Sequence, residues 1–174
     1  PEGCWSLTER PGRLTLTATG DSLDRPGYTF VGRRQQHHDC RAAASLEPGE
    51  AARAGLSVRL DEAHHYDLEV SGGTAAVIAR IGPLRQRVAE HAVPAGPVTL
   101  AVEIRATRVP GTQHGPDTLA FSVGTAGGTV RLAELDGRYL STEVAAGFTG
   151  RVIGMYVTEG RAAFDWFEYA PATP

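Results

Sequence analysis

The chain contains no lysine: all 17 of its basic residues are arginine. Against 20 acidic residues they give a formal net charge of only −3, and the two signs are interspersed along the sequence. Proteins that bind nucleic acid or an anionic membrane surface usually carry a basic patch or stripe. The sequence shows no such cluster, so it predicts neither kind of partner. We attribute the arginine-only composition to the codon bias of a GC-rich bacterial genome.

Long apolar runs are also missing. No stretch of roughly 18 apolar residues could span a bilayer, and no segment has the pattern of a signal peptide. The only methionine is Met155 and the chain starts at Pro1, so we expect it to be an excised or processed part of a larger protein. An upstream signal would have been lost with the preceding part. The sequence therefore does not decide whether the parent protein is cytoplasmic or secreted.

Cysteine is scarce, with Cys4 and Cys40 as its two copies. They could pair in a disulfide if the N-terminal segment lies beside the strand that contains Cys40. Two isolated buried thiols are the alternative, and the spacing does not decide between them.

Helical periodicity is nearly absent, and short segments with a period of two recur between glycine, proline and aspartate residues. Strands are predicted over residues 14–19, 28–44, 54–60, 66–71, 74–81, 85–92, 98–106, 118–123, 129–135, 150–157 and 162–169. Gly72-Gly73 and Gly127-Gly128 predict hairpins, and residues 46–55 could hold one helical turn. The pattern predicts an all-β fold, a two-sheet antiparallel jelly-roll β-sandwich. We expect one domain over residues 1–171, with a frayed end at 172–174.

Seven polar residues follow one another from Arg33 to Asp39. They lie in the middle of the predicted strand 28–44, where apolar and polar residues should alternate because successive side chains point to opposite faces. Both faces of this strand would be polar at its middle. Burying such groups costs free energy unless each finds a hydrogen-bond partner, so we expect the stretch to have a special role.

Four longer segments resemble a known family. They are "GRRQQHHDCRAAASLEP", "AGLSVRLDEAHHYDLEV", "LDGRYLSTEVAAGFTGRVIGMYVTEG" and "AAFDWFEYAP", and the opening "CWSLTERPGRLTLTA" fits as well. In this order and spacing they resemble the C-terminal concanavalin A-like β-sandwich of glycoside hydrolase family 43, the β-xylosidase and α-arabinofuranosidase type. The resemblance covers essentially the whole chain.

The resemblance implies that catalysis takes place on a separate N-terminal five-bladed β-propeller. A propeller blade takes roughly 40 residues, so five blades and a sandwich do not fit in this chain. We therefore expect no catalytic residue here. The implied role is to dock on the propeller and to help wall a pocket for xylose- or arabinose-containing oligosaccharides. The family's pocket-reaching aromatic residue corresponds to Phe148, for which packing inside the domain is the alternative.

The polar stretch has two interpretations. Arg33, Gln35 and His37 could form a row that hydrogen-bonds a sugar, because planar polar groups suit bidentate recognition. We favour the alternative, a hydrogen-bond network inside the domain or at its interface with the propeller. The full set of candidate residues for substrate binding or domain docking is Arg33, Gln35, His37, His65, Tyr66, Phe148 and Trp166.

Metal sites have weak support. The neighbours His64 and His65 point to opposite faces of a strand, and no spacing supplies the three or four ligands of a zinc site. Related sandwich modules often hold a structural calcium ion at a carboxylate near the last strand. Here that residue would be Asp165, with Glu2 or Glu168 as a partner; an ordinary strand or turn carboxylate is the alternative.

Two other functions were weighed. An independent carbohydrate-binding module for xylan or arabinan should show a groove lined with tryptophan or tyrosine, whereas a docking domain should expose an apolar patch. The chain has only two tryptophans and five tyrosines, which disfavours the module. A catalytic jelly roll would need a third acidic residue after Glu134 and Asp136, but Tyr139 stands there, and Asp136-Gly137 has the pattern of a turn.

Overall fold

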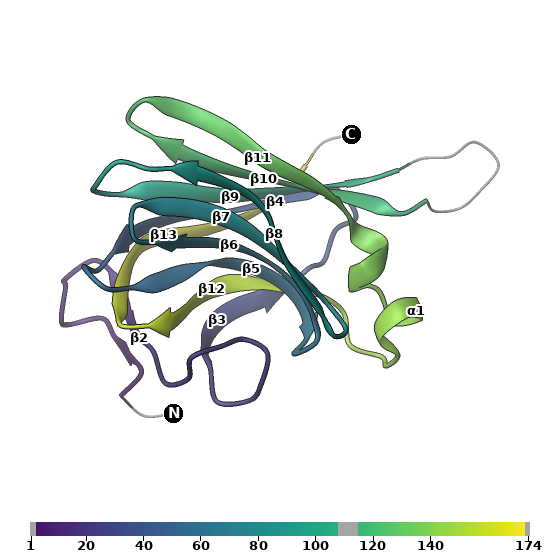
Figure 1. Ribbon diagram of the computed structural model, residues 1–174, viewed down its shortest axis with the longest axis horizontal. Coiled ribbons are helices and arrows are strands. Elements are labelled where there is room, and N and C mark those ends of the chain that lie inside the picture. Colours follow the sequence, from purple (N-terminus) through teal and green to yellow (C-terminus); the bar gives the residue numbers. More distant parts are fainter. Residues whose placement is uncertain (1–2, 108–114, 173–174) are drawn as a thin grey trace.

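The structure, a computed structural model, describes residues 3–107 and 115–172. Within these ranges the chain forms two antiparallel sheets, one of seven strands and one of six, packed face to face (Figure 1). The seven-stranded sheet has the order β1 (Trp5–Ser6), β2 (Leu14–Thr17), β13 (Arg161–Pro171), β4 (Cys40–Pro48), β9 (Val98–Ala106), β10 (Asp117–Thr125) and β11 (Gly128–Asp136). The six-stranded sheet has the order β3 (Thr29–Arg34), β12 (Val152–Glu159), β5 (Arg53–Asp61), β6 (His64–Ser71), β7 (Thr74–Ile81) and β8 (Leu84–Ala92).

The last two strands occupy interior positions. Strand β12 lies between β3 and β5, and β13 lies between β2 and β4. Between β11 and β12 the chain forms a 3-10 helix η1 (Gly137–Leu140) and a one-turn helix α1 (Thr142–Ala145). Together with the start of β10, these helices cover one end of the sandwich (Figure 1).

The core lies between the two sheets and follows the alternation of the strands. Leu56 and Val58 of β5 are fully buried in the same cluster as Leu100 of β9 and Phe121 of β10. Alternate residues of each strand point to one face, so the apolar set of each sheet faces the other sheet. The predicted all-β sandwich is confirmed by this arrangement.

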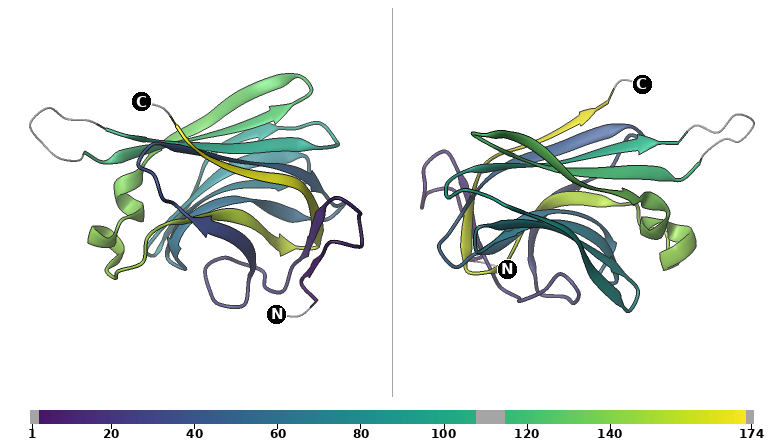
Figure 2. Two further views of the ribbon diagram at one scale, coloured as in Figure 1. Left: turned by 180° about the vertical axis from the view of Figure 1, so that it is seen from behind. Right: turned by 45° about the horizontal axis from the view of Figure 1, so that its top comes forward.

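The predicted strand over residues 28–44 is two strands in different sheets, and this prediction was wrong. Strand β3 ends at Arg34 in the six-stranded sheet, and β4 begins at Cys40 in the seven-stranded sheet. The polar residues Gln35–Asp39 form the crossover between the sheets, which Figure 2 (left) shows as the dark blue segment leading to β4. Gln36, His37 and His38 of the crossover are exposed, so for most of the stretch the free-energy cost of a polar strand interior does not arise.

The structure also bears on two smaller expectations. Residues 46–55 contain the end of β4, a tight turn and the start of β5, and no helical turn forms in them; the helical turns lie at 137–145 instead. The amide of Ala172 donates to the carbonyl of Asp39 at 2.9 Å, so the chain end is held up to this residue. Residues 173–174 lie outside the described part.

The last strand contains a bulge at Asp165, between Phe164 and Trp166. The extra residue shifts the alternation, so that Phe164 on one side of the bulge and Phe167 and Tyr169 on the other all pack toward the core. Uninterrupted alternation over "AAFDWFEY" would instead place Phe164 on the face opposite Phe167 and Tyr169.

Cys4 and Cys40 are both buried, and in the described structure no disulfide joins them. Burial raises the pKa of the Cys40 thiol. Of the two possibilities left open by the sequence, the structure shows two thiols. In addition, no described helix is both long and apolar enough to cross a membrane.

A loop of residues 18–28, the covering loop, joins β2 to β3 and runs below the six-stranded sheet in Figure 1, on the side away from the core. Leu23 of this loop is buried, and the carboxylate of Asp24 lies 2.9 Å from Nε2 of His65 on β6. The covering loop and the sheet therefore share a polar contact on the outer face of the six-stranded sheet.

Candidate functional site

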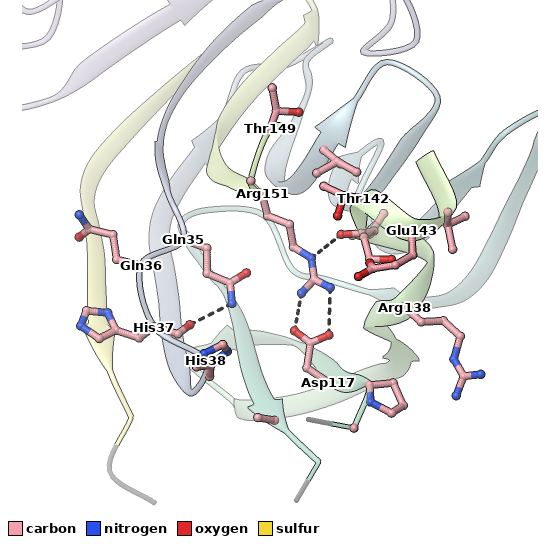
Figure 3. Close-up of a pocket in the computed structure, with 18 residues that line it drawn as sticks. Gln35, Gln36, His37, His38, Asp117, Arg138, Thr142, Glu143, Thr149 and Arg151 are labelled. Carbon is pink, nitrogen blue, oxygen red and sulfur yellow. Dashed lines mark hydrogen bonds and ion pairs between the residues drawn. The ribbon is translucent and has the colours of Figure 1, made fainter. Parts of the chain in front are cut away.

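A cleft of about 790 Å³ opens at the helical end of the sandwich. Its walls are the crossover at Gln35–His38, the start of β10 with the residues just before it, the helices η1 and α1, and residues 149–151 before β12. Figure 3 shows that amide, imidazole, guanidinium, carboxylate and hydroxyl groups line it. The cleft therefore presents polar groups of several kinds among apolar ones, and it is built from segments far apart in sequence.

Arg151 holds the helical wall of the cleft in place. Its Nη2 donates to Oδ1 of Asp117 at 2.9 Å, and its Nη1 donates to the other oxygen of the same carboxylate (Figure 3). Its Nε donates to the carbonyl of Leu140 at 2.7 Å, and its Nη2 also donates to the carbonyl of Gly137. One guanidinium thus ties β10 and both ends of η1 to the start of β12, in the bidentate geometry that makes such pairs strong.

Gly137 has to be a glycine for this arrangement to form. A Cβ atom added to it would lie 1.9 Å from Oδ1 of Asp117. The turn predicted at Asp136-Gly137 is therefore confirmed as the start of η1, where the carboxylate of Asp136 caps the helix by accepting from the amide of Arg138.

Tyr169 anchors the polar crossover from the seven-stranded sheet. Its hydroxyl accepts hydrogen bonds from the backbone amides of Gln36 and His37, at 2.9 and 3.1 Å. The imidazole Nδ1 of His37 lies 3.1 Å from the same hydroxyl, and the guanidinium of Arg33 stacks 4.3 Å from the centre of the ring. Burial raises the pKa of this tyrosine. The ring therefore fixes the path of the chain where it leaves one sheet for the other.

Three of the predicted site residues come together here. Arg33 and His37 both contact Tyr169, and Gln35 lines the cleft with its Nε2 donating to the carbonyl of His37 at 2.9 Å. The Oε1 atom of Gln35 is buried and has no hydrogen-bond partner among the described residues. The crossover thus combines hydrogen bonds within the domain with an acceptor at the cleft that has no partner among the described residues.

Phe148 lies on the loop that leads from α1 to the cleft and has a relative exposure of 106%. The two preceding residues are in the left-handed half of backbone space, with φ of 56° at Ala146 and 121° at Gly147. Tyr139 and Val144, on the same helical segment, are also exposed, by 41% and 45%. Exposed apolar groups on one segment make it a candidate interaction site. The packing alternative for Phe148 is not what the structure shows.

His65 and Tyr66 do not reach the cleft or the surface. His65 has no exposed area, and its two ring nitrogens each lie 2.9 Å from a carboxylate, of Asp67 and of Asp24. Tyr66 faces the core and donates its hydroxyl proton to the carbonyl of Asp136 at 2.8 Å. A side chain with no exposed surface cannot contact a ligand or a docked domain, so we remove both from the candidate contact residues.

Trp166 lies apart from the cleft, on the rim of a second hollow of about 390 Å³ that Leu7, Leu14 and Phe164 also line. Its neighbour Asp165 is exposed at the bulge. Within residues 3–107 and 115–172, no group of three or more histidine, cysteine, aspartate or glutamate side chains is placed to hold a metal ion. Calcium at Asp165 thus stays a prediction, and its suggested partner Glu2 lies outside the described residues.

Arg151, Asp117 and Tyr169 were missed at the level of sequence. Arg151 and Asp117 are 34 residues apart, and Tyr169 and Gln36 are 133 apart. Each of these residues stands in a predicted strand or next to one, where its type is unremarkable. Only the folded structure shows which residues these three side chains contact.

Fold and cleft together define a class of protein: a two-sheet concanavalin A-like β-sandwich with a polar cleft and exposed apolar groups at one end. Residues 1–170 match the family described as the beta xylosidase C-terminal concanavalin A-like domain. The chain belongs to this family, so the resemblance stated from the sequence is confirmed.

Curated and solved relatives agree with this assignment. The chain is 34% identical over 182 residues to the non-reducing end alpha-L-arabinofuranosidase BoGH43B of Bacteroides ovatus, covering 95% of this chain and 32% of that protein. The solved Bacteroides ovatus xyloglucan PUL GH43B superposes with a TM-score of 0.84 at 31% identity, covering 99% of this chain and 35% of that one. The xylan beta-1,4-xylosidase of Bacillus halodurans gives a TM-score of 0.77 at 25% identity, with coverage of 95% and 34%.

These matches also show how much of a relative's length the chain covers. It spans about a third of the length of the curated relative, and it corresponds to the C-terminal domain of family 43 glycoside hydrolases. The carbohydrate binding module CBM66 from Bacillus subtilis shares the fold, with a TM-score of 0.60 at 11% identity, a likeness that speaks for the fold alone.

Proposed function

We propose that this chain is a non-catalytic accessory domain that docks on the catalytic β-propeller of a family 43 glycoside hydrolase and helps to shape its sugar pocket. The observation that carries the proposal is Phe148, an entirely exposed aromatic side chain beside a polar cleft. Leaving such a ring in water forgoes about 1.5–3 kcal/mol of burial free energy. A partner surface that covers it would recover this energy.

The support around Phe148 fits a docking role. The helical segment from which its loop extends is held at η1 by two hydrogen bonds from Arg151, and two more tie the same guanidinium to Asp117 on β10. A contact group on a fixed base loses little conformational entropy when it binds. Tyr139 and Val144 extend the apolar surface on the same segment, while the cleft beside it supplies polar groups that could face a sugar.

The cleft of this chain does not favour catalysis of its own. An inverting glycosidase needs an acid and a base about 6.5–9.5 Å apart on opposite faces of the sugar. Its lining carboxylates are Asp117 and Glu143. Both carboxylate oxygens of Asp117 accept hydrogen bonds from Arg151, so this carboxylate is already occupied by a bidentate partner. We therefore assign catalysis to the propeller, with xylose- or arabinose-containing oligosaccharides as substrates, in line with the names of the relatives.

The test is to add this chain to a family 43 propeller that has been produced without its own sandwich. We expect the propeller to unfold at a higher temperature and to gain kcat/KM on aryl xylosides or arabinofuranosides. In this assay Phe148→Ala should lose about tenfold in kcat/KM, equal to about 1.4 kcal/mol. Leu84→Ala removes another exposed apolar side chain, on β8, and should change neither quantity. No effect of the added chain on stability or activity would refute docking.

An independent carbohydrate-binding module is the second candidate, and the unsatisfied amide oxygen of Gln35 in the cleft favours it. Calorimetric titration of the chain alone with xylo- and arabino-oligosaccharides separates the two. Millimolar or tighter binding without a propeller, lost in Gln35→Leu, would support the module.

A further inference from the structure

The outer face of the six-stranded sheet carries a row of basic side chains that crosses every strand except β12. In register across β3, β12, β5, β6, β7 and β8, the row is Arg34, Val152, Arg59, His65, Arg80 and Arg85. Residues directly opposite each other in neighbouring strands share a face. Leu56 and Val58 of β5 face the core, so Arg59 and its row face outward.

The carboxylates near this row do not match all of its cations. The carboxylate of Asp24 in the covering loop accepts a hydrogen bond from Arg85 and lies 2.9 Å from Nε2 of His65. The carboxylate of Asp67 lies 2.9 Å from Nδ1 of His65. Arg34 and Arg80 have no carboxylate within ion-pair distance among the described residues. Arg80 is still near enough to Asp24 to help lower the pKa of that carboxyl, so Arg34 is the arginine of the row for which the described residues supply no nearby carboxylate.

Arg59 has the clearest unfilled position. Its side chain is only 6% exposed, and its Nη2 lies 3.4 Å from a carboxylate oxygen of Glu62. Its Nη1 is buried and has no hydrogen-bond acceptor in the described structure. A buried charged donor without an acceptor costs free energy, and a bound anion would remove that cost.

An aromatic surface lies beside this guanidinium. The ring of Phe30 lies across Gly32 and Gly154, since a Cβ atom added to either glycine would come within 2.7 Å of it. Tyr28 meets Phe30 edge-on with ring centres 6.4 Å apart, and the guanidinium of Arg59 stacks 4.2 Å from the centre of Tyr28. The two glycines leave room for the Phe30 ring to lie along the sheet, and this ring is partly exposed.

We propose that this face binds the uronic acid residue of an acidic saccharide, with Phe30 under the sugar ring and its carboxylate between Arg34 and Arg59. Guanidinium forks bind planar carboxylates in a bidentate manner, and the C–H face of a pyranose packs on an aromatic ring. A protein carboxylate could satisfy the arginines, but it has no apolar ring face to place on Phe30. The site goes beyond the docking role and needs no propeller.

Arg34 also connects this site to the cleft. Its Nη1 lies 3.7 Å from the position that a Cβ atom on Gly150 would occupy, at the base of the loop that carries Phe148. An acidic saccharide bound here would therefore lie next to the end of the domain assigned to the propeller.

Calorimetry of the 174-residue chain tests the proposal with three probes. They are xylotetraose bearing one glucuronic acid group, unsubstituted xylotetraose, and hexaglutamate. We expect the acidic sugar to bind at least about tenfold more tightly than the neutral sugar, as for a charged hydrogen-bonding pair. Its affinity should fall with added salt because the pair is partly exposed. Equal affinity for the two sugars, or tighter binding of hexaglutamate, would overturn the proposal.

Variants locate the site. Arg34→Gln and Phe30→Leu should each weaken the acidic sugar by about tenfold or more. Arg41→Gln is the matched control, because Arg41 is an exposed arginine on the other sheet, 3.9 Å from Glu168. Circular dichroism checks that each variant is folded. An equal loss in the Arg41 variant would show that only net charge matters and would overturn the site. Phe148→Ala should leave this binding unchanged, which separates the inference from the docking proposal.

Discussion

Arg151 and Asp117 form a bidentate ion pair that closes the helical end of the sandwich, with side chains only 12% and 18% exposed. The pair joins the start of β12 to the start of β10, and the remaining donors of Arg151 hold both ends of η1. The geometry of the cleft and the position of the loop that carries Phe148 therefore depend on one guanidinium.

Arg151→Gln should lower the free energy of unfolding by about 2 kcal/mol or more, between the ~0–1 kcal/mol of exposed pairs and the ~3–5 kcal/mol lost when a buried pair is broken. Urea unfolding of this variant, of Asp117→Asn and of the double variant gives the coupling energy. Arg41→Gln, whose exposed pair with Glu168 has a distance of 3.9 Å, should change stability by less than about 0.5 kcal/mol. A coupling energy near zero would mean that the pair does not hold the end of the sandwich.

Tyr169→Phe should loosen the polar crossover. The variant keeps the ring under Arg33 but removes the hydroxyl that accepts from the amides of Gln36 and His37. These amides lie near the surface and water can replace the hydroxyl, so we expect a loss of only about 1 kcal/mol. Amide hydrogen exchange at the two residues should become faster, whereas Tyr139→Phe, at an exposed tyrosine, should leave it unchanged. Unchanged exchange in the Tyr169 variant would show that the hydroxyl does not anchor the crossover.

His65 should stabilise the fold more at acidic than at alkaline pH. Burial by itself lowers the pKa of His65, but the carboxylates of Asp67 and Asp24 outweigh it and raise this pKa above its ordinary value of 6.5. A raised folded-state pKa gives stability that is fully present below the unfolded value and is lost as the pH rises through the folded value. The difference in unfolding free energy between the protein and His65→Gln should thus be larger at pH about 5.5 than at pH about 9.

Ser57→Ala serves as the control for this experiment, because it removes a neutral donor to Asp67 at 2.7 Å and no titrating group. Its difference from the unmodified protein should vary little between pH about 5.5 and 9. The lowest pH is kept above the range where Asp24 titrates, since the pKa of that carboxyl is lowered by Arg85 and His65 in spite of its partial burial. A difference for His65→Gln that grows with pH would contradict the prediction.

The two cysteines should react as protected thiols. Both are buried, and burial raises the pKa of Cys40, which reduces the thiolate that a disulfide reagent attacks. Ellman's reagent should therefore react slowly with the native protein and should titrate two thiols after unfolding in urea without reductant. Reaction only after reduction would show that Cys4 and Cys40 are joined.

The sequence predicted the strands better than it predicted their connections. The segments 74–81 and 98–106 were placed with their observed ends, because alternation and the flanking turns marked them clearly. The polar stretch was read as one strand because a period of two shows where a strand is but not which sheet it joins. The bulge at Asp165 has no signal in composition, and it reverses the faces that plain alternation gives to the residues after it.

The candidate site was predictable only in part. Gln35, His37 and Phe148 were found from the polar stretch and the family resemblance, and all three lie at or near the cleft. Arg151 and Tyr169 were not found, because their roles depend on contacts across 34 and 132 or more residues of chain. His65 and Tyr66 were chosen for their chemistry, but burial on opposite faces of β6 gives both of them structural roles.

The interior positions of β12 and β13 impose an order on biosynthesis. On the ribosome, neither sheet can close until β12 and β13 have emerged, since β3 waits for β12 and β2 waits for β13. Such long-range pairing is slow and leaves strand edges unprotected for a time. A nascent chain stalled before residue 152 would therefore present unpaired β3 and β5 edges to other chains, and would be a natural client for chaperones.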